Sequence, residues 1–284
     1  MLKNIIHSPV LLNEIIEFMP QNTKTYYDWT LWHGGHAKSI LETDENISLI
    51  GIDRDNLMLK KAENNLSELK NEKHFYHGSY ADIDKYSDNI DYMLLDLWVN
   101  MEHFLDYERG FSIRGDGALD MRFDKTSQTT AKSIIDTYSP DMLGKIFEKY
   151  GNFSPNAALR LATAIVKKKK DIVSTYKLKE VLSEERMGIK RIIVIFQALR
   201  IEVNQELEEL EKFLEVFGKH LVKWWRCSII SYHSIEDRIV KYALKGLHQN
   251  GFELLTKHVV KPKWDEVKNN RAARSAKLRV IEKL

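Results

Sequence analysis

The stretch Tyr26-Tyr27-Asp28-Trp29-Thr30-Leu31-Trp32-His33-Gly34-Gly35-His36, followed by Leu49-Ile50-Gly51-Ile52-Asp53, decides the fold. It runs in the order strand, turn, helix, strand and acidic residue. This order is typical of α/β domains that bind a nucleoside, because the turn brings backbone close to the ligand and the acid hydrogen-bonds ribose hydroxyls. The pattern predicts that role for Asp53. A helix cap is the alternative role, for which Asp55 is better placed.

Apolar runs of strand length and helix length alternate through the first hundred residues and again near the C-terminus. This alternation predicts an α/β fold with a doubly wound parallel sheet and right-handed crossovers. Strands are expected at residues 25–27, 49–52, 74–77, 92–97 and 227–232, with late strands at 252–260 and 277–281. Helices are expected at residues 10–19, 36–41, 56–69 and 235–247.

The middle of the chain breaks this alternation. Four successive helices are expected there, at residues 127–136, 140–149, 155–170 and 176–183. A charged helix is expected over residues 202–217, with Gly218 as its stop. The simplest organisation is a core formed by residues 1–103 and 205–284, interrupted by an inserted helical domain over residues 104–204.

Composition and charge are those of an ordinary soluble globular protein, with 43% hydrophobic and 30% charged residues among 284. The net charge of +2 gives no global preference for nucleic acid, so such contact must rest on local basic patches. The candidates are Lys167–Lys170 and the group Arg271, Arg274, Lys277 and Arg279, for which a solvated surface is the alternative.

The single cysteine, Cys227, excludes an internal disulfide and fits a reducing cytoplasm. No apolar run reaches the roughly 20 residues that a membrane-spanning helix needs. The histidines and the cysteine show no metal-ligand spacing, and no nucleophile-elbow pattern is present.

Two polar residues at strand ends are further candidates for chemistry. Asp96 ends an expected strand, where a charge points toward the ligand edge of an open α/β sheet, although a capping or turn role is equally open. His233 follows another expected strand. The next residue, Ser234, resembles a helix cap paired with Asp237, an arrangement that leaves His233 unexplained.

Longer motifs occur in one order along almost the whole chain. The most specific are Gly117-Ala118-Leu119-Asp120-Met121-Arg122 and His233-Ser234-Ile235-Glu236-Asp237-Arg238-Ile239-Val240-Lys241. The others are His7-Ser8-Pro9-Val10-Leu11-Leu12, Gly34-Gly35-His36, Gly51-Ile52-Asp53-Arg54-Asp55, Arg109-Gly110-Phe111-Ser112, Phe196-Gln197-Ala198-Leu199-Arg200-Ile201 with Asn204, and Arg274-Ser275-Ala276-Lys277-Leu278-Arg279. Together they resemble the RsmH (MraW) family, the bacterial small-subunit rRNA cytosine-N4 methyltransferases.

This resemblance implies a class I (Rossmann-like) methyltransferase core with an inserted helical substrate-recognition domain. It implies S-adenosyl-L-methionine as methyl donor and N4 of a decoding-region (P-site) cytidine in 16S rRNA as acceptor. The implied partner is the small ribosomal subunit in the cytoplasm, without a membrane, and a homodimer is allowed. By motif alignment, the donor-binding positions are Gly34, Gly35, His36, Asp53, Tyr80, Asp96 and His103.

The acceptor side of the reaction requires a group that accepts hydrogen bonds from the cytosine amine, because that nitrogen is a poor nucleophile. Asp96 and Asn100 are the candidates, with His233 as a positioning residue, and no metal is expected at the chemical step. Two departures from the family bear on the site: His103 stands where a glutamine is expected, and Arg191–Ile195 replace a His-Pro-Ala-Thr-like run.

Five of the six tryptophans stand at positions where the family has glycine: Trp29, Trp32, Trp98, Trp224 and Trp225. Trp264 has no assigned counterpart. Indoles there would strain the turns or fill the donor pocket, and overpacking costs about 1–3 kcal/mol per site. One hypothesis is that UGA codons decoded as glycine were translated as tryptophan. One alternative function is a catalytically silent RNA-binding relative. Another is a small-molecule methyltransferase, which the basic C-terminal segment and the helical insertion disfavour.

Overall fold

The computed structural model describes residues 9–86 and 90–284, which form two compact units. Unit 1 extends to Trp98 and resumes over Leu207–Leu284, and unit 2 is Val99–Glu206. Residues His7 and Ser8 of the first resemblance motif lie outside the described residues. Within the described part of the chain, every helix is too short or too polar to cross a membrane.

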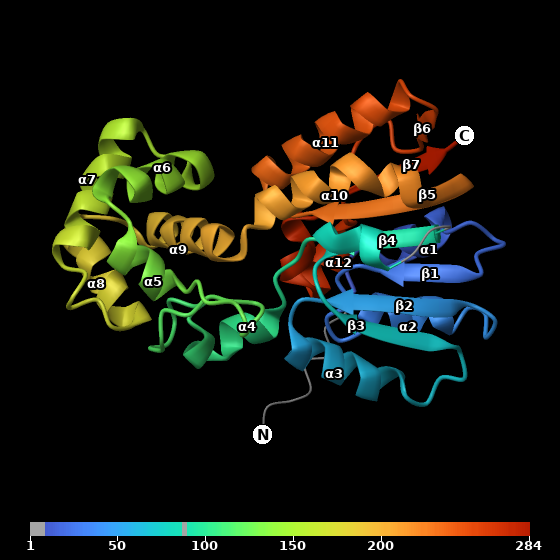
Figure 1. The fold of residues 1–284 in the computed structure, drawn as a ribbon, viewed down its shortest axis with the longest axis horizontal. Coiled ribbons are helices and arrows are strands. Elements are labelled where there is room, and N and C mark those ends of the chain that lie inside the picture. The colour runs from blue at the N-terminus through green and yellow to red at the C-terminus, as the bar shows by residue number, and fades with distance from the viewer. Residues whose placement is uncertain (1–8, 87–89) are drawn as a thin grey trace. The chain divides into compact units, whose positions relative to one another are not determined.

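Unit 1 is built on a seven-stranded sheet with the strand order β3-β2-β1-β4-β5-β7-β6 (Figure 1). The central strand β1 (Thr25–Asp28) pairs in parallel with both β2 (Ser48–Asp53) and β4 (Ile90–Asp96). The strand order therefore reverses beside β1, which is where open α/β sheets bind their ligands. The parallel part continues through β3 (Lys73–His77) and β5 (Leu221–Ser231).

The other edge of the sheet is antiparallel, so the predicted parallel arrangement extends only from β3 to β5. β7 (Lys277–Lys283) pairs antiparallel with both β5 and β6 (Phe252–Leu254). The expected strand 252–260 is reduced to β6 and an isolated bridge at Val260. An apolar run reports burial but not strand direction, so the sequence pattern could not show this reversal.

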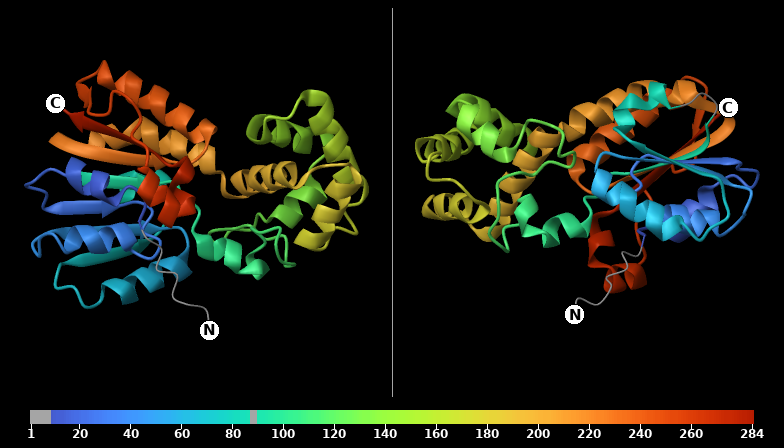
Figure 2. Two further views of the ribbon diagram at one scale, coloured as in Figure 1. Left: turned by 180° about the vertical axis from the view of Figure 1, so that it is seen from behind. Right: turned by 60° about the horizontal axis from the view of Figure 1, so that its bottom comes forward.

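Helices cover both faces of the sheet in unit 1 (Figures 1 and 2). One face packs against α1 (Leu12–Phe18), α2 (Gly35–Leu41) and α3 (Asn56–Leu66). The opposite face packs against the 3-10 helix η1 (Tyr80–Lys85), α10 (Glu206–His220) and α11 (Ser234–His248). The neighbours Tyr26 and Tyr27 enter opposite cores because side chains alternate along a strand.

A short segment before β7 anchors the N-terminal region of unit 1. It contains α12 (Trp264–Asn269) and the 3-10 helix η3 (Arg271–Ser275). The Glu266 side chain accepts a 2.7 Å hydrogen bond from the backbone N–H of Leu11. This contact holds the chain just before α1 against α12.

Unit 2 is helical. Its elements are α4 (Met101–Leu105), η2 (Tyr107–Arg109), α5 (Ala131–Thr137), α6 (Pro140–Gly151), α7 (Pro155–Lys167), α8 (Thr175–Glu184) and α9 (Ile189–Asn204). The four predicted helices correspond to α5–α8 and are confirmed with shifted ends. The sequence prediction missed α9, although Ile192, Ile195, Phe196 and Leu199 follow helical spacing and are buried.

The predicted single helix over residues 202–217 is wrong, because two helices meet there. α9 ends at Asn204, Gln205 adopts a left-handed conformation with φ of 51°, and α10 begins at Glu206. Gly218 lies inside α10 and does not stop it. No glycine or proline marks the break, so the sequence offered no ordinary signal for it.

The last residue of α9 holds the Gly117–Arg122 motif in place. The Asn204 side-chain amide donates a 2.7 Å hydrogen bond to the Met121 carbonyl, and its oxygen accepts a 2.8 Å bond from the Phe123 N–H. The Arg109 guanidinium donates to the carbonyls of Arg122 and Phe123 at 2.7 and 3.1 Å. This loop has no regular secondary structure, so these side chains satisfy its backbone groups.

Replacing Asn204 by alanine should destabilise the protein strongly, because Asn204→Ala orphans buried backbone groups of Met121 and Phe123. The expected loss is roughly 1–3 kcal/mol of unfolding free energy for each orphaned group. Urea unfolding followed by circular dichroism measures it. The control Asn156→Ala changes an exposed residue of α7 and should shift stability by less than about 0.5 kcal/mol. Equal effects of the two substitutions would contradict the assignment.

Candidate cofactor and active site

The turn that follows β1 is hydrogen-bonded to the ends of both neighbouring strands. Oγ1 of Thr30 accepts a 2.7 Å hydrogen bond from the backbone N–H of Asp96, at the end of β4. The backbone N–H of Trp32 donates a 2.8 Å bond to Oδ2 of Asp53, at the end of β2. One short turn thus brings the two predicted site carboxylates to the same edge of the sheet.

Asp53 is buried, and hydrogen bonds occupy both of its carboxylate oxygens. Oδ1 accepts a 2.8 Å bond from the N–H of Asp55, while Oδ2 holds Trp32. Burial raises the pKa of Asp53 to about 7, against the opposing effect of these two backbone bonds. Asp55, whose side chain accepts from the Leu57 N–H at 3.0 Å, caps α3. The capping role therefore belongs to Asp55, as the sequence predicts, and leaves Asp53 at the strand end.

Asp28 is a third buried carboxylate at this edge. It ends β1 and accepts hydrogen bonds from the Tyr26 hydroxyl at 2.9 Å and from the Thr30 N–H at 3.3 Å. Burial raises the pKa of Asp28 to about 6, with the charge of Asp96 adding to the rise. The sequence prediction missed this residue, although it ends a strand in the same way as Asp53 and Asp96.

His36 lies beside Asp96 on the first turn of α2. Its Nδ1 is 3.8 Å from Oδ2 of Asp96, and its Nε2 is 2.9 Å from the Val10 carbonyl oxygen. Burial lowers the pKa of His36, which favours a neutral imidazole, while the charge of Asp28 opposes this shift. His36 thus connects the chain before α1 to the carboxylate edge.

Asp96 is flanked by aromatic side chains. Burial raises the pKa of Asp96 to about 7. The backbone N–H of Trp98 lies 3.3 Å from Oδ1 of Asp96, and the ring of Trp98 is 4.5 Å from that of Tyr232 at the end of β5. The negative charge of Asp96 contributes to a raised pKa of Tyr232, after burial. Tyr232 is a second residue that the sequence prediction missed, because its position was assigned only to the strand.

His233 caps α11, so the predicted cap at Ser234 with Asp237 is wrong. Nδ1 of His233 accepts a 3.3 Å hydrogen bond from the Glu236 N–H, and the Glu236 carboxylate accepts from the backbone N–H groups of Tyr232 and His233. Nε2 of His233 lies 2.8 Å from Glu236. The capping pair thus lies one residue nearer the N-terminus than predicted. This position gives His233 a role that the predicted cap at Ser234 did not explain.

Asp237 instead neutralises part of the basic C-terminal group. Its carboxylate pairs with Lys277 at 3.0 Å and with Arg279 at 2.9 Å. These pairs tie α11 to β7. The exposed members of the group are Arg271 and Arg274.

The predicted glycines and Tyr80 also lie in unit 1. Gly34 has φ of 74° and caps α2, of which Gly35 is the first residue. The positive φ favours glycine, and a Cβ there would lie only 3.0 Å from the side chain of Leu66. Tyr80 begins η1 and packs edge-on against Phe213 of α10, with ring centroids 5.9 Å apart.

Asn100 and His103 belong to unit 2, on the short helix α4. The Asn100 side chain caps α4 by accepting a 2.9 Å hydrogen bond from the Glu102 N–H. His103 is buried between the rings of Phe111 and Phe123, at 5.0 and 5.3 Å. Their predicted roles beside Asp96 stay predictions.

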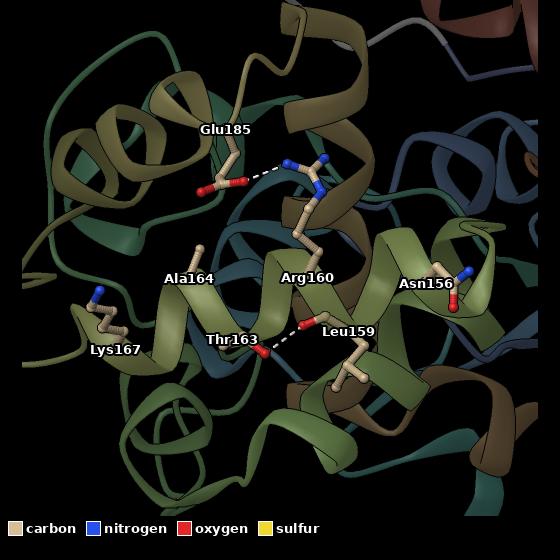
Figure 3. A pocket seen from close by; sticks show the side chains of 7 residues that line it. All are labelled: Asn156, Leu159, Arg160, Thr163, Ala164, Lys167 and Glu185. Carbon is tan, nitrogen blue, oxygen red and sulfur yellow. Dashed lines mark hydrogen bonds and ion pairs between the residues drawn. The ribbon is translucent and has the colours of Figure 1, made fainter.

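Unit 2 also has a hollow of about 480 Å³, separate from the predicted site residues. Figure 3 shows α7 along its floor, with Arg160 facing Glu185. Part of the basic run is engaged internally, because Lys168 pairs with Glu184 and Lys169 donates to the Asp136 carbonyl. The hollow is lined by Asn156, Leu159, Arg160, Thr163, Ala164, Lys167 and Glu185.

Comparison with known proteins decides the family. The sequence profile of the MraW methylase family matches residues 4–284. The chain belongs to the MraW methylase family. It is similar to the ribosomal RNA small subunit methyltransferase H of Elusimicrobium minutum (strain Pei191), with 39% identity over 296 residues and full coverage of both chains. The protein of the same name from Gloeothece citriformis (strain PCC 7424) is 38% identical, over 98% of this chain and 94% of that one.

Among solved structures, the crystal structure of PH0851 aligns with a TM-score of 0.50 and 11% identity, over 98% of this chain and 47% of that one. This likeness concerns the fold alone. The alternation of strands and helices and the strand order of unit 1 are those of a Rossmann-like α/β fold. The described residues include no cluster of three or more metal-ligating side chains.

The buried carboxyls should make stability depend on pH in a defined direction. The pKa values of Asp53 and Asp96 are about 7 in the folded protein, above the value of ~4 for an unfolded aspartate. Their stabilising contribution is therefore fully present below pH ~4 and is lost as pH rises through about 7. The unfolding free energy of the parent, compared with that of Asp53→Asn and Asp96→Asn, should therefore fall by roughly a few kcal/mol between pH 5 and 8.

Urea unfolding at several pH values measures this difference. Glu68→Gln, which changes an exposed carboxylate on the surface just after α3, is the matched control and should show no such slope. A parent protein that gains stability over the variants as pH rises would contradict the assignment.

Proposed function

We propose that this chain transfers a methyl group from S-adenosyl-L-methionine to N4 of a decoding-region (P-site) cytidine in 16S rRNA. The observation that carries the proposal is the pair Asp53 and Asp96, joined at one sheet edge through the turn after β1. Membership of the MraW methylase family supports the rRNA substrate, because the similar proteins are named ribosomal RNA small subunit methyltransferases.

The backbone and carboxylates of unit 1 fit the cofactor. When bound, it supplies a methyl group carried on a positively charged sulfur. Asp53 lies where ribose hydroxyls are bound in this type of fold. The buried carboxyls of Asp28, Asp53 and Asp96 favour a cationic ligand, because a nearby positive charge stabilises their ionised forms. The bulky side chains of Trp29, Trp32 and Trp98, which follow β1 and β4, do not fit it.

Asp96 is the candidate for the acceptor side of the reaction. The lone pair of the cytosine amine is delocalised into the ring, so the nitrogen must be positioned and its N–H groups hydrogen-bonded. A carboxylate at the end of β4 accepts such a bond. With a pKa near 7, Asp96 is also suited to take up the proton that the amine loses. We assign the same acceptor role to Asn100 and assign His233 to positioning the base, which must leave its stack to reach the site.

Exposed cations on both units are the candidates for contact with the rRNA backbone. They are Arg271 and Arg274 in unit 1, and Lys167 and Lys170 in unit 2. Arginine and lysine contacts to phosphate supply sequence-independent affinity. We propose the small ribosomal subunit as the partner and unit 2 as the substrate-recognition domain.

A second candidate function is favoured by one specific observation. The indole of Trp29 is 1% exposed and packs against the rings of Tyr27, Tyr86 and Phe213. A chain with these indoles in place would keep the fold and the basic surface without binding the donor. This candidate is a catalytically silent RNA-binding relative.

A methylation assay with isolated small subunits tests the first function. The subunits should lack the modification. The enzyme should be tested in two forms, one with tryptophan and one with glycine at residues 29, 32, 98, 224 and 225. Mass spectrometry of nuclease digests is expected to find one methyl group on N4 of a decoding-region cytidine. Asp96→Ala in the active form should lower the rate by roughly 100-fold or more. The control Glu68→Ala should leave the rate unchanged.

A methyl group at another base position, or on another RNA, would contradict the proposed function. RNA binding by both forms without any transfer would favour the silent relative.

A further inference from the structure

Two of the tryptophans have backbone conformations that favour glycine. The φ angles of Trp32 and Trp224 are 51° and 72°, in the left-handed region. In this region the Cβ of an L-residue crowds the backbone, and a bulky side chain there is a genuine outlier. Glycine adopts the same conformation without that cost. Backbone geometry therefore favours glycine at both positions, and Leu11, Met121 and Gln205 are other non-glycine residues with positive φ.

The position of Trp224 in its strand agrees with this reading. Ile90 of β4 pairs with Leu221 of β5, whereas Tyr92 pairs with Arg226, so β5 bulges between these pairs. A bulge residue with positive φ is commonly glycine. The Trp224 side chain is 59% exposed, so burial in a core does not account for an indole here.

Trp29 occupies a buried position beside the candidate donor site. Its ring stacks on Tyr27 at 5.6 Å and meets Tyr86 and Phe213 edge-on at 5.8 and 5.9 Å. Phe213 also contacts Tyr80, one of the predicted donor-binding residues. The buried indole N–H of Trp29 has no hydrogen-bond partner among the described residues. A genuine core tryptophan normally finds such a partner.

Trp98 and Trp32 adjoin the two site carboxylates. Trp98 follows Asp96 by two residues and packs on Tyr232, and its buried indole N–H likewise has no partner in the described part of the chain. Trp32 lies in the turn itself, with its backbone N–H on Asp53. Trp29 and Trp32 thus follow the end of β1, and Trp98 follows the end of β4.

We propose that the side chains of Trp29, Trp32 and Trp98 close the donor site of this chain, and that the functional protein has glycine at these positions and at residue 224. Glycine at residues 32 and 224 removes the backbone conflict. Glycine at residues 29 and 98 removes two buried indoles whose N–H groups lack a partner within residues 9–86 and 90–284. This inference rests on the proposed function, because it takes the edge beside Asp53 and Asp96 as the donor site.

Calorimetric titration with S-adenosylhomocysteine tests the inference without requiring catalysis. The triple variant Trp29→Gly, Trp32→Gly, Trp98→Gly should bind the ligand, whereas the parent should give no heat of binding at the same concentrations. Trp224→Gly alone should raise the melting temperature without creating binding, since it relieves a strained bulge outside the donor site. Trp264→Gly is the matched control: that side chain is 72% exposed on α12 and should affect neither property.

Binding by the parent would overturn the inference, and so would a folded triple variant, judged by circular dichroism, that does not bind. Binding by the triple variant without transfer to cytidine N4 would support the inference and refute the proposed function.

If the triple variant does not fold, peptide mass spectrometry of the protein purified from its own cells gives an independent answer. Glycine at residues 29, 32 and 98 would support the inference, and the corresponding codons should then be UGA. Tryptophan at these residues, encoded by UGG, would overturn it.

Discussion

Two hydrogen bonds from one turn organise the functional edge of this protein. The Thr30 side chain holds the end of β4, and the Trp32 backbone holds the Asp53 carboxylate at the end of β2. Because β1 lies between these strands, the turn can reach both only where the strand order reverses. The placement of Asp53 and Asp96 depends on this constraint. The backbone N–H of residue 32, which needs no particular side chain, makes one of the two bonds.

The electrostatics of the edge follow from its burial. Asp28, Asp53 and Asp96 end three adjacent strands and are at most 5% exposed, so their charged forms are poorly solvated. Backbone N–H groups compensate only part of this loss, and the pKa values remain between about 6 and 7. Such a group of carboxyls is costly for a fold on its own. A ligand that brings positive charge and hydroxyl groups offsets that cost, which ties the stability of the edge to its function.

Several tryptophans near this site conflict with the local structure. Their positions were first unusual only by resemblance to a family. The structure adds physical reasons that do not depend on relatives. They are positive φ at Trp32 and Trp224, and buried indole N–H groups of Trp29 and Trp98 that find no partner among the residues that the structure describes. Trp264, which is exposed at the start of a helix, shows neither problem. The strain is therefore specific to certain tryptophans and is not a general property of this residue type in the chain.

The sequence predicted the site best where local rules act. Apolar runs located β1, β2 and β4, and the spacing after β2 separated the helix-capping Asp55 from Asp53. It failed where tertiary contacts decide. The break at Gln205 has no glycine or proline, Gly218 is tolerated inside α10, and β7 reverses direction without any change in its apolar pattern. The capping role of His233 was missed because histidine is an uncommon cap, although Glu236 three residues later supports it.

The most direct test of the account is a crystal structure of the glycine form at residues 29, 32 and 98 with S-adenosylhomocysteine bound. We predict that the ribose hydroxyls hydrogen-bond Asp53 and that the sulfur faces Asp96, with the ligand lying along the turn after β1. A ligand bound elsewhere on the protein, or a ribose without contact to Asp53, would contradict the account.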